Sequence, residues 1–138
     1  DNFESGVGNW TLNTNWALTA GVGVGGSNAI KATNTFANSP MIATYQPNIN
    51  LQGRIGCTLN YYYSQVGSSQ LANSIDLYFG GQNIRRDLAS VASSNVSQFL
   101  TVFEGNSNNS LYFACNIPAN NGQSAPCTID NVVLNCQQ

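Results

Sequence analysis

The sequence predicts an all-β domain, an antiparallel two-sheet β-sandwich of the jelly-roll kind. Apolar and polar residues alternate along short runs, whereas helical periodicity is almost absent. Clusters of Gly, Asn and Ser, typical of turns, separate these runs. The length of 138 residues is that of one domain. We therefore expect residues 1–138 to form a single sandwich.

Eight runs qualify as strands, and their spacing is that of two antiparallel sheets packed face to face. The segment 87–96 fits either a short helix or a loop. The expected strands are Trp16–Thr19, Asn28–Ala32, Pro40–Gln46, Arg54–Ser64, Ser74–Phe79, Phe99–Glu104, Ser110–Ile117 and Thr128–Asn135.

Alternation also sorts the two faces of the strands over 54–64, 74–79 and 110–117, because successive side chains point to opposite sides of a sheet. The expected core positions are Ile55, Cys57, Leu59, Tyr61, Tyr63, Ile75, Leu77, Phe79, Leu111, Phe113, Cys115 and Ile117. The opposite face of each strand carries an aromatic ring beside an amide or an acid. Those outward faces are the candidates for function.

The charge content excludes several classes of function. Only 7% of the residues are charged, against about 25% in a typical domain. The net charge is −2 and the four cations form no cluster, which argues against a nucleic-acid partner. The chain has no histidine, and therefore no Ser-His-Asp arrangement. No apolar stretch is long enough to span a bilayer.

The four cysteines predict an oxidised, secreted protein. They show no CxxC spacing, which disfavours zinc. Three pairings are formally open, and we expect Cys115–Cys127, fastening the ends of a hairpin, together with Cys57–Cys136. Three Asn-x-Ser/Thr sequons, at Asn9, Asn95 and Asn108, agree with an extracellular glycoprotein from which a signal peptide has been removed.

The two ends of the chain carry short motifs. The first ten residues read DNFESGVGNW, and residues 127–136 read CTIDNVVLNC. An opening Asn-Phe-Glu-x-Gly with a following Trp, and a closing Ile-Asp-Asn-Val-x-Leu, resemble the galactose-binding-like β-sandwich of carbohydrate-binding modules. The similarity is to modules appended to xylanases and glucanases and to fungal secreted relatives. It implies non-catalytic binding of a polysaccharide or glycan, with a catalytic domain as a possible partner in the full-length protein.

The resemblance also implies a structural calcium ion, with Glu4 and Asp130 as ligands. In such modules an acid from each end of the chain joins backbone carbonyls around the metal, and Ca²⁺ takes six to eight oxygen ligands. A carboxylate in an apolar strand needs a metal or another partner. Asn131 stands where many members have a second acid. The alternative is that Asp130 accepts hydrogen bonds from N-terminal backbone amides or pairs with Lys31, without a metal.

The outward faces carry the chemistry that recognises sugars. Aromatic rings stack on the apolar face of a pyranose, and planar polar groups hydrogen-bond its hydroxyls. Loop residues Trp10, Trp16 and Tyr45 are an alternative site, and ordinary cross-strand packing is the other explanation for outward tyrosines. The candidate binding residues are Asn60, Tyr62, Asp76, Tyr78, Arg85 (or its neighbour Arg86), Tyr112 and Asn116.

Catalysis by this chain is not expected. A glycosidase needs two facing carboxylates, and Asp76 with Glu104 is the least implausible pair among six acids. Nothing beside them resembles an active-site motif. The expectation is a monomeric, non-catalytic binding module, and the alternative is a structural or adhesive cell-wall protein without a glycan groove.

Overall fold

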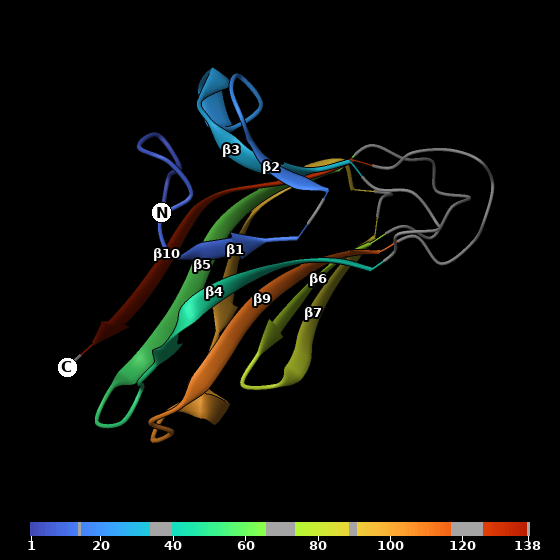
Figure 1. The fold of residues 1–138 in the computed structure, drawn as a ribbon. Coiled ribbons are helices and arrows are strands. Elements are labelled where there is room, and N and C mark those ends of the chain that lie inside the picture. The colour runs from blue at the N-terminus through green and yellow to red at the C-terminus, as the bar shows by residue number, and fades with distance from the viewer. Residues whose placement is uncertain (14, 34–39, 66–73, 89–90, 117–125, 138) are drawn as a thin grey trace.

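The computed structural model describes residues 1–13, 15–33, 40–65, 74–88, 91–116 and 126–137. Within them ten strands form two five-stranded antiparallel sheets, ordered β1-β4-β9-β6-β7 (sheet A) and β2-β3-β10-β5-β8 (sheet B) (Figure 1). The predicted all-β two-sheet sandwich is confirmed. The strands are β1 Trp10–Leu12, β2 Trp16–Thr19, β3 Ala29–Ala32, β4 Met41–Ile49, β5 Ile55–Gln65, β6 Ser74–Phe79, β7 Gln82–Leu88, β8 Ser93–Phe99, β9 Asn109–Asn116 and β10 Cys127–Gln137.

The helical segments among the described residues are single 3-10 turns, Val24–Gly26 and Thr101–Phe103. None of them is long and apolar enough to cross a membrane. The expected strand Phe99–Glu104 is wrong, because β8 ends at Phe99 and the second turn follows it. The segment 87–96 was expected to be a short helix or a loop. It contains the end of β7 and the start of β8, and the described residues between these strands, 91–92, belong to neither.

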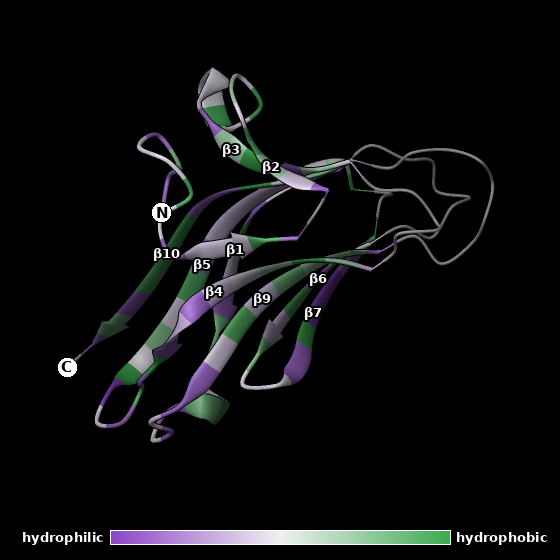
Figure 2. Cartoon of the chain, viewed as in Figure 1, coloured by the Kyte–Doolittle hydropathy of each residue, from purple (hydrophilic) through white to green (hydrophobic). Residues whose placement is uncertain are grey.

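The core lies between the two sheets, where the predicted alternation places it. Figure 2 shows the alternation as hydrophobic and hydrophilic bands along β9. The rings of Trp10 and Tyr61 both pack on Phe113, with centroids 5.8 and 4.8 Å from it. Ile55 is an exception to the prediction, since it is 56% exposed, and Ile117 lies outside the described residues. The other expected core positions, from Cys57 to Cys115, are buried.

Both disulfides have the expected partners, Cys57–Cys136 and Cys115–Cys127. The first joins neighbouring strands of sheet B, β5 and β10. The second does not fasten a hairpin, as was expected from the sequence, because β9 belongs to sheet A and β10 to sheet B. It therefore connects the two sheets across the core.

The two ends of the chain meet. The Asp1 ammonium group donates a hydrogen bond to the Val132 carbonyl, and the Val132 N–H donates one to the Asp1 carbonyl at 2.9 Å. The first residues thus lie beside β10 (Figure 1).

Candidate functional site

A groove of about 240 Å³ lies on the outer face of sheet A. Strands β4, β9, β6 and β7 are consecutive in this sheet, and all of them, with Pro40, contribute to its lining. Their outward side chains form the floor because the alternate residues of the same strands fill the core. The lining residues are Pro40, Ile42, Asp76, Tyr78, Arg86, Tyr112, Ala114 and Asn116.

Two tyrosines form an aromatic row across the groove. Tyr78 of β6 lies directly opposite Tyr112 of β9, and their rings stack with centroids 4.4 Å apart and planes 10° from parallel. Each ring covers one face of the other, so at most one face of each ring is left for a ligand. Burial, and then the neighbouring Tyr78, raises the pKa of the Tyr112 hydroxyl. That hydroxyl stays protonated at neutral pH and can both donate and accept hydrogen bonds.

An ion pair forms the next row of the groove. Asp76 lies opposite Arg86 on one side and Ala114 on the other. The Arg86 Nε and Nη2 atoms donate to its two carboxylate oxygens at 3.0 and 2.9 Å. The Asp76 side chain is 3% exposed and that of Arg86 53%. Hydrogen bonding to Asp76, followed by its charge, raises the pKa of Arg86.

This pairing decides which ligand charge the groove accepts. The guanidinium has five N–H groups and donates two of them to Asp76, so three remain for ligand oxygens. The charges of the pair cancel, and no other charged residue lines the groove among the residues that the structure describes. Stacking surfaces beside neutralised hydrogen-bonding groups suit a neutral polyhydroxyl ligand.

The structure divides the predicted binding residues between different surfaces. Asp76, Tyr78, Tyr112 and Asn116 come together in the groove. Asn60 and Tyr62 are instead on β5 of sheet B, where Asn60 lies opposite Ser97 and Tyr62 opposite Asn95. The outward faces of β5 and β6 therefore do not form one surface.

Arg85 does not line the groove. It alternates with Arg86 along β7, and its Nε and Nη2 atoms donate to Asp87 at 2.8 and 2.9 Å. Arg85 also interacts electrostatically with the buried Tyr61, and burial is the main cause that raises the pKa of that tyrosine. Arg85 thus lies on the side of β7 that faces sheet B, and Arg86 is the arginine of the groove.

Glu4 and Asp130 both bind the loop 23–28, which precedes β3. The Glu4 Oε1 atom accepts a hydrogen bond from the Asn28 N–H at 2.6 Å. The Asp130 Oδ2 atom accepts from the Val24 N–H at 3.0 Å and from the Ser27 hydroxyl at 2.9 Å. Asp130 is fully buried. Its hydrogen-bond partners are thus this loop and the adjacent Asn131 N–H, rather than Lys31.

The loop 23–28 offers part of what a calcium site needs. Around Gly23 converge three oxygens, from Asp130 Oδ2, Ser27 Oγ and the Asn28 carbonyl, and a Cβ at Gly23 would overlap all of them. Oxygen donors of this kind suit Ca²⁺. Within the described part of the chain, no group of three or more Cys, Asp or Glu side chains gathers where it could hold a metal. Backbone and hydroxyl oxygens would have to supply the other ligands.

The fold of this chain is found in solved structures. A CBM4 structure matches with a TM-score of 0.63 and 12% identity over 98% of this chain and 99% of that chain. A family 16 carbohydrate-binding module matches with a TM-score of 0.60 and 12% identity, covering 91% of this chain and 89% of that one. A non-crystalline-cellulose-specific module, CBM28, matches with a TM-score of 0.56 and 12% identity, covering 91% and 86%. The chain has the fold of carbohydrate-binding modules.

No family model matches the sequence, and no curated protein matches it. The carbohydrate-binding-module fold is thus recognised from the arrangement of the strands, and at these identities the similarity defines the fold alone.

Three groove residues had no role assigned from the sequence, Pro40, Ile42 and Ala114, and Arg86 was named only as the alternative to Arg85. A signal for an arginine beside Asp76 was present, although it did not distinguish Arg85 from Arg86. Gly80-Gly81 follows the run Ser74–Phe79, and a Gly-Gly pair between two strands indicates a two-residue hairpin. Both glycines have positive φ, 57° and 80°, and a Cβ at Gly80 would overlap the Phe103 ring. This hairpin brings β7 beside β6 and thereby an arginine beside Asp76.

Proposed function

We propose that this chain binds a neutral polysaccharide, without catalysis, in the groove on the outer face of sheet A. The observation that carries the proposal is the stacked pair Tyr78–Tyr112 beside the neutralised pair Asp76–Arg86. The first supplies flat apolar surfaces for sugar rings, and the second supplies donors for sugar hydroxyls. The fold shared with carbohydrate-binding modules supports the same function.

The acids that a glycosidase would need have other partners. Asp76 is paired with Arg86 through both oxygens. Glu104 accepts a hydrogen bond from the Cys57 N–H at 2.8 Å, and Cys57 belongs to the other sheet. These contacts support a binding role rather than hydrolysis. Release of reducing sugar that is lost in Asp76→Asn would contradict it.

Affinity electrophoresis against soluble glucans, xylans and mannans tests the groove. We expect at least one neutral polysaccharide to retard the wild type, and Tyr78→Ala or Tyr112→Ala to weaken binding about tenfold or more, as loss of an aromatic anchor does. Tyr62→Ala is the matched control, since Tyr62 is a tyrosine on the outer face of sheet B, and it should bind like the wild type.

Two results would overturn this assignment. If Tyr62→Ala loses binding and the groove variants keep it, the site lies on sheet B. If no glycan retards the wild type, the structural or adhesive role becomes the better explanation. The structural or adhesive role is supported by two exposed apolar residues, Phe99 and Val102, which are 67% and 79% accessible.

We also propose that a structural Ca²⁺ binds at the loop 23–28, held by Glu4, Asp130 and oxygens of the loop. The proposal rests on the two carboxylates that reach this loop and on the oxygens that surround Gly23. The ion would tie the first residues and the last strand to one loop. Its role would be stability, because the groove is built from other residues.

Thermal unfolding in calcium and in EDTA tests this site. At free calcium about 100 times Kd we expect the wild type to melt on the order of 5–10 °C higher than in EDTA. Glu4→Gln keeps an acceptor for the Asn28 N–H but removes a charged ligand, so it should reduce this difference. Glu104→Gln is the matched control, because its carboxylate also accepts one backbone N–H. Identical wild-type melting curves in the two buffers would show that hydrogen bonds alone hold the loop.

An extracellular location is part of the proposal. Two disulfides support it. The sequon residues Asn9, Asn95 and Asn108 are all exposed, so they are accessible to glycosylation. We expect the domain to act as a monomer and to deliver a catalytic domain of the same protein to its polysaccharide.

A further inference from the structure

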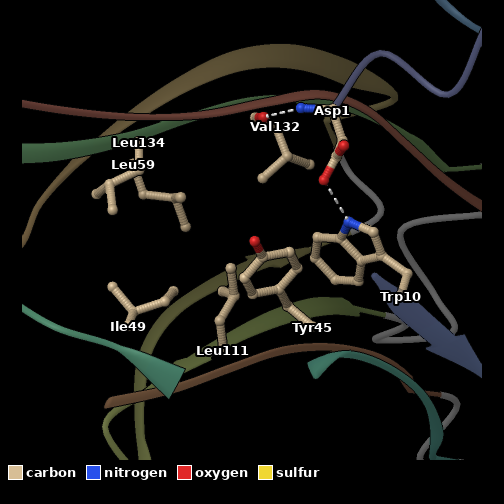
Figure 3. Close-up of a pocket in the computed structure, with 8 residues that line it drawn as sticks. All are labelled: Asp1, Trp10, Tyr45, Ile49, Leu59, Leu111, Val132 and Leu134. Atoms are coloured by element: carbon tan, nitrogen blue, oxygen red, sulfur yellow. Dashed lines mark hydrogen bonds between the residues drawn. The ribbon is translucent and has the colours of Figure 1, made fainter. Parts of the chain in front are cut away.

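A second cavity, of about 210 Å³, lies between the two sheets and shares no residue with the groove. Sheet A contributes Trp10, Tyr45, Ile49 and Leu111, and sheet B contributes Leu59, Val132 and Leu134, with Asp1 at one end (Figure 3). We call it the inter-sheet cleft. It opens at the edge formed by β4 and β10.

The strand pairing explains why the sandwich is open there. The ladder between β1 and β4 ends at Tyr45, and the ladder between β3 and β10 ends at Ile129. Beyond these residues no described strand covers the two edges. Both strands also have irregular register at this place, between Tyr45 and Ile49 and between Asp130 and Val133. Bulges redirect side chains and are over-represented next to functional sites.

The walls of the cleft are apolar, and its polar groups lie toward one end. Leu59 and Leu111 are buried, whereas Leu134 is 38% exposed at the opening. The Asp1 carboxylate accepts a hydrogen bond from the Trp10 Nε1 at 3.0 Å. A carboxylate has about four acceptor sites, so it can accept further donors. The Tyr45 hydroxyl points into the cleft (Figure 3) and has no hydrogen bond within the described part of the chain.

We propose that the inter-sheet cleft binds a small neutral aromatic alcohol. A cavity of about 150 Å³ with apolar walls is enough for benzene, so this volume accommodates one aromatic ring with a short arm. The rings of Trp10 and Tyr45, 5.5 Å apart between centroids, offer aromatic contacts to it. The ligand hydroxyl donates to the Asp1 carboxylate or to the Tyr45 oxygen.

Ions are a poor fit for the cleft. Asp1 brings both a carboxylate and an ammonium group to one end of it, so neither sign of charge is favoured there. An ion of either sign would lose its hydration against five aliphatic side chains. A sugar is a poor fit because its hydroxyls would face the same aliphatic walls without partners. The cleft is therefore a separate site, and its occupation does not depend on the polysaccharide groove.

The two tryptophans allow a direct test by NMR. The chain has two indole N–H groups, and only that of Trp10 lies in the cleft. On titration with 2-phenylethanol we expect the Trp10 indole signal of the ¹⁵N-labelled protein to shift saturably while that of Trp16 stays in place. No saturable shift of the Trp10 signal would refute the proposal, and a shift with cellobiose or xylobiose would assign the cleft to a sugar instead.

Matched variants distinguish binding in the cleft from a nonspecific effect of adding an aromatic ring to β10. Leu134→Phe narrows the opening, whereas Val133→Phe adds the same ring to the adjacent, 45% exposed residue that lies opposite Asn60. We expect at least fivefold weaker binding of 2-phenylethanol in the first and no change in the second. Tyr45→Phe should weaken binding of 2-phenylethanol and leave that of ethylbenzene unchanged. Equal affinities for Leu134→Phe and Val133→Phe would overturn the assignment, provided both spectra keep the native dispersion.

Discussion

Removal of the Cys57–Cys136 disulfide should lower the free energy of unfolding by about 4.5 kcal/mol, the largest effect expected of any change in this chain. The bridge joins residues 79 positions apart. In the chain-entropy model a disulfide acts mainly by restricting the unfolded chain, and the restriction grows with the length of the closed loop. The double variant Cys57→Ala/Cys136→Ala measures this effect by urea unfolding without reductant.

The second disulfide provides the matched comparison. Cys115 and Cys127 are 12 positions apart, so the double variant Cys115→Ala/Cys127→Ala should lose only about 3 kcal/mol. Both double variants replace one disulfide by two alanines, and the main difference between them is loop length. If the Cys115/Cys127 variant proves the less stable of the two, its connection between the sheets matters more than the entropy of the unfolded chain.

The sequence predicted the fold where alternation was strong. Strands β5, β6 and β9 each have two neighbouring strands in their sheet, and their core residues recur at every second position. Strands β7 and β8 are the edges of their sheets and read QNIRRDL and SSNVSQF. The side chains of an edge strand are only partly buried, so few of them are apolar and the alternation of apolar and polar residues is weak. These strands and the three-residue β1 were missed for this reason.

The groove could be predicted only in part, because alternation gives the face of a residue but not its sheet. Tyr62 and Tyr78 show the same local pattern, yet β5 lies in sheet B and β6 in sheet A. Which strands become neighbours depends on long-range pairing. Four of the eight residues that line the groove were therefore among those grouped from the sequence, while Asn60 and Tyr62 were grouped with them but lie on the other sheet.

The sequence favoured Arg85 as the arginine of the groove, whereas Arg86 lines it, and the cause of this difference is local. In the β6–β7 hairpin Phe79 pairs with Gln82 and Tyr78 with Asn83, but Leu77 pairs with Arg85 and Asp76 with Arg86. The register shifts by one residue after Tyr78. A one-residue shift moves a side chain to the opposite face of the sheet. Regular pairing would have placed Arg85 opposite Asp76, and no feature of the sequence marks the irregularity.

Loss of the Asp130 carboxylate should destabilise the protein by about 3–4 kcal/mol, since hydrogen bonds to a charged acceptor are worth about 1.5–3 kcal/mol each and buried donors would lose their partner. The three donors are the Val24 N–H, the Ser27 hydroxyl and the Asn131 N–H, the last at 2.7 Å. Asn131 has a positive φ of 52° at the irregularity of β10. The carboxylate therefore holds both the loop 23–28 and the bend of the last strand.

A graded series of variants measures this contribution by urea unfolding in EDTA, so that calcium plays no part. Asp130→Ala removes every acceptor, while Asp130→Asn keeps one oxygen and should lose roughly half as much. Gly23→Ala should disturb the same hydrogen bonds while keeping the carboxylate, because its new Cβ would overlap the Asp130 Oδ2 atom. Val133→Ala, at an exposed position on the same strand, should stay within about 0.5 kcal/mol of the wild type.

The outcome decides how the closing motif contributes to the fold. If Asp130→Ala and Gly23→Ala both lose stability while Val133→Ala does not, the acid in this otherwise uncharged strand is required because it joins the last strand to an early loop. That requirement would hold with or without a metal, since the hydrogen bonds are made by the protein alone. An Asp130→Ala variant within about 1 kcal/mol of the wild type would mean that water replaces the carboxylate at these donors.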